Sequence, residues 1–259
     1  MWIARVAALL LLTLPLAACG DVGDGASGTG GDGDAGGTLT VFAAASLTET
    51  FTELGETFEK GRPGVRVRFN FGGSSSLARQ ITEGAPADVF ASASPATMKP
   101  VTDAGDATGR PRMFAANRLV IAVPRDNPGK IHAVRDLSRP GRKVVLCAAP
   151  VPCGAAARTA LGVAGVDVEP VSLEQDVKAV VTKVGLGEAD AGLVYRTDIA
   201  AASGKVTGIE FPEAARAVSE YPIVEVADAP RPALAREFIG LVLSPAGRAV
   251  LSRAGFEAP

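Results

Sequence analysis

Residues 38–58 read TLTVFAAASLTETFTELGETF, and the spacing of the apolar residues changes partway along this stretch. Thr38–Ala43 is a short β-prone run, which predicts a strand. Beyond it, apolar residues recur at helical spacing, at Leu47, Phe51, Leu54 and Phe58. Ser46–Glu49 matches a capping box, so the helix is expected to begin at Ser46. A strand, a short loop and a helix form the repeating unit of α/β folds.

The same order of elements recurs along the chain. Further strands are expected over 65–71, 87–91, 119–123, 143–147 and 191–195. Helices are expected over 77–83, 95–104, 155–161 and 177–184, the last with Asp176 as its cap. The alternation predicts parallel α/β sheets, divided between two lobes that meet near Asn117.

The first 37 residues differ from the rest in composition. Residues 1–18 carry one early cation and then an apolar run too short to span a bilayer, which predicts a secretory signal peptide. Leu16-Ala17-Ala18-Cys19 resembles a bacterial lipobox, so Cys19 is expected to be lipidated; the alternative is an ordinary signal peptide with an incidental cysteine. Residues 20–37 are half glycine with four aspartates, so residues 19–37 are interpreted as the lipidated cysteine and a flexible linker.

The composition excludes several classes of protein. A net charge of −2 without a basic block argues against nucleic-acid binding. The only histidine, His132, argues against histidine-based metal sites, and three cysteines are too few for a four-cysteine zinc site. No GKS or GKT follows the glycine-rich linker, so that segment is not a phosphate-binding loop.

Small or hydroxyl residues fill the loops that precede four of the expected helices. These loops are residues 43–46, 72–76, 151–154 and 175–177. Helix N-termini carry unpaired N–H groups and partial positive charge, so several that converge bind an anion without lysine or arginine. Taken singly, each feature has a simpler interpretation: Ser46 as a helix cap, residues 72–76 as a flexible turn, and Tyr195 as a core residue. Cys147 and Cys153 are expected to form a disulfide in an exported protein.

In sequence order, several strings resemble the periplasmic molybdate-binding proteins of bacterial ABC importers. They are Val41–Thr48 (VFAAASLT), Gly73–Gln80 (GSSSLARQ), Gly84–Ala91 (GAPADVFA), Asn117–Val120 (NRLV), Val151–Gly154 (VPCG), Glu174–Val177 (EQDV), Ala191–Tyr195 (AGLVY) and Glu220–Pro222 (EYP). The resemblance covers most of residues 38–259. It implies a type II solute-binding fold of two α/β lobes joined by a hinge of two crossings. Lobe I would hold residues 38–116 and 221–259, and lobe II residues 117–220.

The resemblance also implies a set of ligand contacts for a tetrahedral oxyanion. Ser46 and Ser74 would donate hydroxyl and backbone hydrogens, Cys153 and Val177 backbone N–H groups, and Tyr195 its hydroxyl. Molybdenum would be present only within the oxyanion. The family often has alanine at the position of Cys153 and no cysteine at that of Cys147, which makes this loop a departure. Ser75 and Ser76 adjoin Ser74, so the residue carried over could be displaced by one.

The function implied is capture of molybdate or tungstate and delivery to the permease and ATPase subunits of an ABC importer. The protein would be a monomer without cofactor or catalytic activity, lipid-anchored at the outer face of the cytoplasmic membrane. One alternative is a binding protein for another oxyanion, such as sulfate. An iron-binding relative is disfavoured because Tyr195 and Tyr221 are the only tyrosines. A secreted serine hydrolase is disfavoured by the absence of a Gly-x-Ser-x-Gly elbow and by the single histidine, His132.

Overall fold

The computed structural model describes residues 36–202 and 204–259. The expected signal peptide and Cys19 lie outside the described residues, as does nearly all of the expected linker. Within the described part of the chain, no helix has the length and apolar character needed to cross a membrane.

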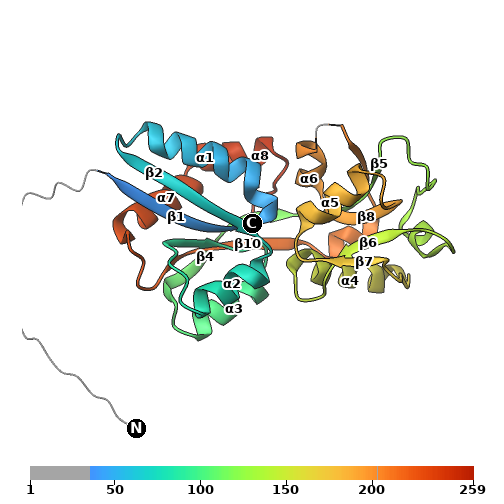
Figure 1. The fold of residues 1–259 in the computed structure, drawn as a ribbon, viewed down its shortest axis with the longest axis horizontal. Coiled ribbons are helices and arrows are strands. Elements are labelled where there is room, and N and C mark those ends of the chain that lie inside the picture. The colour runs from blue at the N-terminus through green and yellow to red at the C-terminus, as the bar shows by residue number, and fades with distance from the viewer. Residues whose placement is uncertain (1–35, 203) are drawn as a thin grey trace, which may run out of the picture. The chain divides into compact units, whose positions relative to one another are not determined.

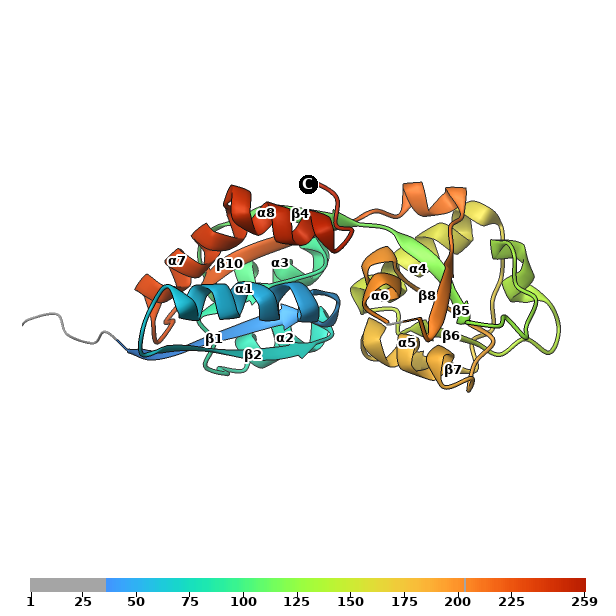
Figure 2. The same cartoon turned by 90° about the horizontal axis from the view of Figure 1, so that it is seen from above.

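The first sheet has five strands in the order β2-β1-β3-β10-β4. Their bounds are β1 (Gly37–Ala44), β2 (Val65–Gly72), β3 (Val89–Ala91), β4 (Ala107–Asn117) and β10 (Ser219–Val226). The helices that belong to it are α1 (Thr48–Lys60), α2 (Ser74–Thr82), α3 (Pro95–Asp103), α7 (Pro232–Leu243) and α8 (Pro245–Arg253). Helices α1, α7 and α8 cover one face of the sheet, and α2 and α3 cover the other (Figure 1; Figure 2).

The second sheet has five strands in the order β7-β6-β8-β5-β9. Their bounds are β5 (Leu119–Pro124), β6 (Val144–Cys147), β7 (Ser172–Glu174), β8 (Ala191–Tyr195) and β9 (Val206–Ile209). Its helices are α4 (Pro152–Ala164), α5 (Val177–Gly185) and α6 (Arg196–Ala201), with 3-10 segments at Val134–Ser138 and Pro212–Arg216. A hydrophobic core separate from that of the first sheet fills the space between these elements.

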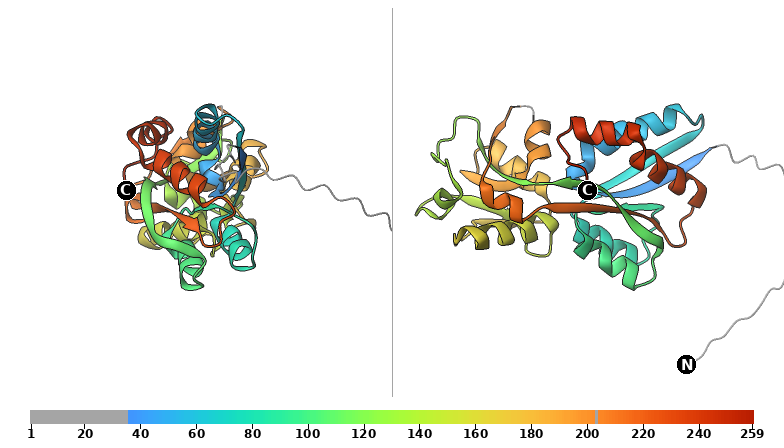
Figure 3. Two further views of the ribbon diagram at one scale, coloured as in Figure 1. Left: turned by 90° about the vertical axis from the view of Figure 1, so that its left-hand side faces the viewer. Right: turned by 180° about the vertical axis from the view of Figure 1, so that it is seen from behind.

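The chain passes between the two sheets twice, through extended segments. The first passage leads from β4 through Arg118 into β5, and the second leads from the Pro212–Arg216 segment into β10. The two passages run side by side, because Asn117 pairs with Ser219 in the ladder between β4 and β10 (Figure 3, right). The predicted α/β fold of two lobes is confirmed. We propose the lobe boundaries of the sequence analysis, lobe I at 38–116 and 221–259 and lobe II at 117–220, for this arrangement.

The prediction of parallel sheets was right for β1, β2 and β3 and for β6, β7 and β8, and wrong for the remaining strands. Strand β10 runs antiparallel to β3 and β4, and β5 runs antiparallel to β8 and β9. Both β5 and β10 enter their sheets directly from the neighbouring lobe, so no crossover helix turns the chain back to the common direction. Two helices also begin earlier than expected, α2 at Ser74 and α4 at Pro152. These earlier starts place the first turn of each helix at the junction of the lobes.

Candidate functional site

A small pocket lies between the two lobes, where β1 and β2 end in lobe I and where α4 and α5 begin in lobe II. Its cavity volume is about 10 Å³, far below the roughly 300–1,000 Å³ of pockets for drug-sized molecules, so only a small ligand suits it. The lining residues are Ala44, Ala45, Ser46, Gly72, Gly73, Ser74, Ala93, Val151, Pro152, Cys153, Asp176, Val177 and Tyr195. Among these described residues, only Asp176 carries a formal charge.

Ser46 lies in a short 3-10 turn, Ala45–Leu47, that connects β1 to α1. The predicted capping box was wrong, because Leu47 is the N-cap of α1 and no side chain caps it. The hydroxyl of Ser46 instead lies 2.9 Å from the hydroxyl of Tyr221, a contact across 175 residues of sequence. Local spacing therefore singled out Ser46 but predicted a helix N–H as its hydrogen-bond partner, where the structure has the hydroxyl of Tyr221.

Ser74 is the first residue of α2 and is almost fully buried. Its Oγ accepts a hydrogen bond of 3.0 Å from the backbone N–H of Ala93, two residues beyond the end of β3. A hydroxyl carries one hydrogen besides its acceptor lone pairs. The Ser74 hydrogen is thus free to be donated into the pocket while the oxygen is held in place.

Lobe II presents the first turns of two helices to the pocket. Val177 begins α5, and the carboxylate of Asp176 caps that helix by accepting from Ala179 N–H at 3.0 Å, as predicted. Cys153 lies in the first turn of α4, and the structure joins it to Cys147 in a disulfide with Cα atoms 5.7 Å apart. Because Asp176 already accepts from its own helix, its charge is directed to that helix N-terminus.

Tyr195 is the last residue of β8, and it is both buried and part of the pocket lining. Its hydroxyl lies 3.0 Å from Ser219 Oγ. Burial raises the pKa of Tyr195 well above its ordinary value, so the hydroxyl stays protonated and can donate a hydrogen bond at any physiological pH. The structure thus brings Ser46, Ser74, Cys153, Val177 and Tyr195 to one pocket; their contact with a ligand stays a prediction.

Sequence reasoning missed the polar residues behind the pocket. Tyr221 is fully buried beside Ser46, and its ring meets that of Tyr195 edge to face at 6.2 Å. Ser219 and Asn117, at the two passages between the lobes, are also buried and belong to the same cluster. No spacing rule links these positions, because each contact joins segments far apart in the chain.

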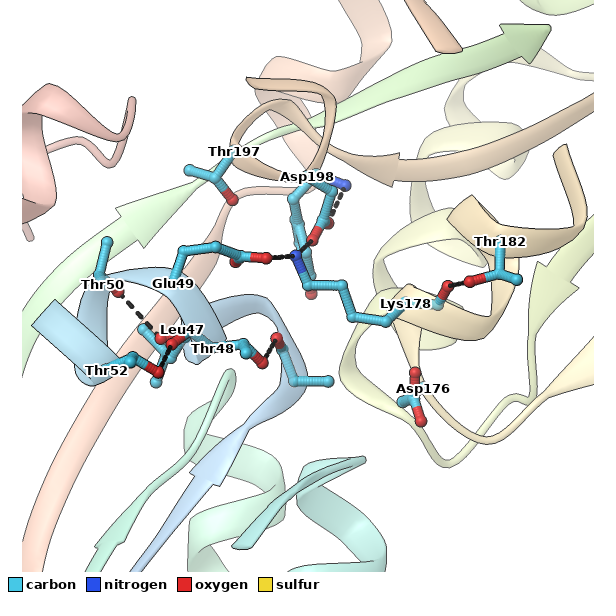
Figure 4. Close-up of polar contacts among 12 residues, drawn as sticks. Leu47, Thr48, Glu49, Thr50, Thr52, Asp176, Lys178, Thr182, Thr197 and Asp198 are labelled. Carbon is cyan, nitrogen blue, oxygen red and sulfur yellow. Dashed lines mark hydrogen bonds and ion pairs between the residues drawn. The ribbon is translucent and has the colours of Figure 1, made fainter. Parts of the chain in front are cut away.

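An ion pair joins the lobes beside the pocket, as Figure 4 shows. The ammonium of Lys178, on α5, lies 2.8 Å from Glu49 on α1 and 3.3 Å from Oδ1 of Asp198 on α6. Asp198 is buried, and its Oδ2 accepts from Tyr195 N–H at 3.0 Å. Burial raises the pKa of Asp198 to about 6, against the lowering effect of Lys178. The only cation of this group is therefore matched by two carboxylates and leaves no net positive charge for a ligand.

The residues that other classes of function would need do not gather here. His132 is exposed and is absent from the lining of the pocket that holds Ser46 and Ser74. Among the residues that the structure describes, no group of three or more His, Cys, Asp or Glu is placed to hold a metal ion. The hydroxyls and helix N-termini that line the pocket are hydrogen-bond donors of the kind that bind an anion.

Replacing Cys147 and Cys153 together by serine is expected to lower the free energy of unfolding by about 2 kcal/mol, as the chain-entropy relation gives for so short a loop. The disulfide ties the start of α4 to the end of β6, so the variant should also bind ligand more weakly through a less ordered loop. Chemical denaturation and calorimetry of both proteins measure the two effects. Unchanged stability would contradict the expectation.

Comparisons with known proteins agree with this fold. The sequence profile of the family described as bacterial extracellular solute-binding protein matches residues 39–257. The molybdate-binding protein ModA of Mycobacterium tuberculosis is 46% identical over 260 residues, which cover 100% of this chain and 99% of the relative. The periplasmic molybdate-binding protein of Azotobacter vinelandii superposes with a TM-score of 0.73 at 24% identity, over 85% of this chain and 99% of that one. The sulfate-binding protein SubI of Mycobacterium tuberculosis superposes with a TM-score of 0.74 at 19% identity, over 85% and 86% of the two chains. The two structural matches show the fold alone.

Proposed function

The chain belongs to the bacterial extracellular solute-binding proteins, and on that premise we propose that it captures molybdate or tungstate for an ABC importer. A relative of nearly equal length, 46% identical, carries the name molybdate-binding protein. The single observation that carries the proposal is the pocket between the lobes, whose donors are hydroxyls and helix N-termini rather than cations.

The chemistry of the pocket fits a doubly charged oxyanion with no proton. We propose that Ser46, Ser74 and Tyr195 donate their hydroxyl hydrogens, and that Cys153 and Val177 donate backbone N–H groups. The N-termini of α2, α4 and α5 add partial positive charge from both lobes. Such a set binds an anion strongly because each donor is fixed before the ligand arrives.

The donor set selects by charge state and by size. Molybdate, tungstate and sulfate are dianions whose oxygens all accept hydrogen bonds. Monohydrogen phosphate carries a proton that would face a donor and remain unpaired, at a cost of about 1–3 kcal/mol. Sulfate meets the same electrostatic requirement, so the size of the closed cage has to separate it from molybdate. Sulfate binding is therefore the alternative that the experiment below must distinguish.

Capture requires the lobes to close on the ligand. A ligand that contacts both lobes favours the closed form through its differential affinity for that form. In the structure, Gly73 of lobe I lies against the backbone carbonyl of Gln175 in lobe II, which marks where the lobes meet. The closed protein would then dock on a membrane permease, and ATP would be hydrolysed on other subunits. We propose that this chain itself is a monomer that binds without a cofactor and catalyses no reaction.

The location of the protein rests on the N-terminal sequence and on its family. We propose that the signal peptide is removed and that lipidated Cys19 anchors the protein at the outer face of the cytoplasmic membrane. The Leu16–Cys19 string supports this anchor. The glycine-rich segment that follows would let the folded lobes reach the permease while anchored.

Titration calorimetry of the purified protein with molybdate, tungstate, sulfate and phosphate tests the proposal. Molybdate and tungstate are expected to bind with affinities well above those of sulfate and phosphate. Tighter binding of sulfate than of molybdate would overturn the assignment. His132→Ala is the control, because it removes the only histidine from an exposed position and should leave every affinity unchanged.

A further inference from the structure

A pair of buried hydroxyls links the second passage between the lobes to the pocket. Tyr221 lies in β10, and its hydroxyl is 2.9 Å from Oγ of Ser46, which lines the pocket. Both side chains are nearly inaccessible to solvent. Buried polar groups of this kind act as a network, because each hydrogen bond fixes the direction of the next.

The hydrogen of the Tyr221 hydroxyl has one acceptor within reach. Among the residues that the structure describes, Ser46 Oγ is the only hydrogen-bond partner of that hydroxyl. A buried donor left without an acceptor costs about 1–3 kcal/mol, so Tyr221 donates and Ser46 accepts.

The hydrogen bond from Tyr221 sets the direction in which Ser46 points its own hydrogen. Burial raises the pKa of Tyr221 well above the ordinary value, so the hydroxyl keeps its hydrogen. Because that hydrogen goes to Ser46 Oγ, 2.9 Å away, the hydrogen of Ser46 itself is left for the pocket. Tyr195 is also supported by Ser219, whose hydroxyl lies 3.0 Å away.

We propose that Tyr221 is a positioning residue that holds Ser46 as a hydrogen-bond donor and so sets the selectivity of the pocket against protonated anions. The proposal rests on the proposed function, since it requires an anion in the pocket. A serine hydroxyl free to rotate either donates or accepts. With Tyr221 donating to it, Ser46 presents its hydrogen, which suits molybdate and opposes the proton of monohydrogen phosphate.

Tyr221→Phe tests this role, because it removes only the hydroxyl. In mildly alkaline buffer, where phosphate is mostly the monohydrogen dianion, molybdate is expected to bind the variant several-fold more weakly. Phosphate is expected to gain relative to molybdate, because Ser46 can now turn and accept its proton. The ratio of the two affinities, measured by direct titration and by competition of phosphate against bound molybdate, should fall by about tenfold, as for the reversal of one hydrogen bond. A ratio equal to that of the wild type, or phosphate binding by neither protein, overturns the proposal.

A matched variant separates this role from general effects on folding. Thr50→Val removes a buried hydroxyl of α1 that donates to Leu47 O at 3.1 Å, outside the pocket lining, and should leave the ratio unchanged. If the wild type fails to bind molybdate, the proposed function fails. If the wild type binds it and Tyr221→Phe keeps the ratio, only the positioning role of Tyr221 fails.

Discussion

Alanine in place of Gly73 is expected to weaken ligand binding by about two orders of magnitude while both lobes stay folded. A Cβ atom at this position would lie 2.1 Å from the backbone oxygen of Gln175, in the opposite lobe. Overpacking costs about 1–3 kcal/mol, at the upper end when the contact is rigid backbone, and this corresponds to up to roughly a hundredfold in affinity. The loss would fall on the closed form, because only there do the two lobes meet at this point.

The backbone of Gly73 has an ordinary conformation. With φ of −65° and ψ of 127°, it lies in the extended region that alanine adopts without strain. The substitution therefore removes closure without disturbing lobe I, apart from a small change at the N-cap of α2. Glycine is needed here for close approach of the lobes rather than for a special turn.

Gly240→Ala is the control for Gly73→Ala. A Cβ atom at Gly240, in α7 and outside the pocket lining, would meet no atom within 4 Å. Calorimetry with molybdate and thermal unfolding without ligand should be measured for both variants. Affinity of Gly73→Ala within a factor of about three of the wild type would show that closure does not require this contact.

Lys178→Met is expected to destabilise the folded protein in a strongly pH-dependent way. Lys178 is the cation that faces buried Asp198, and Glu49 is the other carboxylate of the group. Removing one partner of a fully buried pair costs about 3–5 kcal/mol, and the loss here should be about 2–3 kcal/mol at pH 8, since the Lys178 side chain is 27% exposed.

The direction of the pH dependence follows from the raised pKa of Asp198. That pKa is about 6 in the folded protein against an ordinary value of 3.8, so ionisation of Asp198 opposes folding. Its contribution to stability is fully present below about pH 3.8 and is lost as the pH rises through about 6. Removing Lys178 raises the pKa of Asp198 further, because the charge of Lys178 lowers that pKa in the native protein. The stability of the variant therefore continues to fall up to a higher pH. The variant and the wild type should therefore be nearly equal near pH 5 and diverge toward pH 8.

Denaturant unfolding from pH 5 to pH 8 measures this difference. Lys178→Met combined with Asp198→Asn is the control, because asparagine can still accept from Tyr195 N–H but carries no charge. The double variant should regain most of the lost stability at pH 8, and its difference from the wild type should no longer grow with pH. A pH-independent loss in Lys178→Met would show that packing of its side chain, rather than charge, is responsible.

Local patterns in the sequence were sufficient for most elements that carry the site. The strand before Ser46, the cap at Asp176 and the buried strand ending at Tyr195 were predicted from periodicity and capping chemistry and are confirmed. Each depends on residues within one or two turns of one another, where the backbone has few alternatives. The capping box at Ser46 failed because Tyr221 offers that hydroxyl a buried partner from another strand.

The strand–loop–helix order around the pocket, the lack of cationic residues in the site loops and the pairing of Cys147 with Cys153 could be inferred from the sequence by itself, since all depend on neighbours along the chain. Strands β4 and β10 and helices α7 and α8 were not predicted. Only the tertiary structure decided that Gly73 meets Gln175, that Lys178 lies between Glu49 and Asp198, and that the Tyr221 hydroxyl lies beside that of Ser46. These contacts join segments that the hinge and the two sheets bring together, and neither hydrophobic periodicity nor spacing encodes the meeting of surfaces from separate lobes.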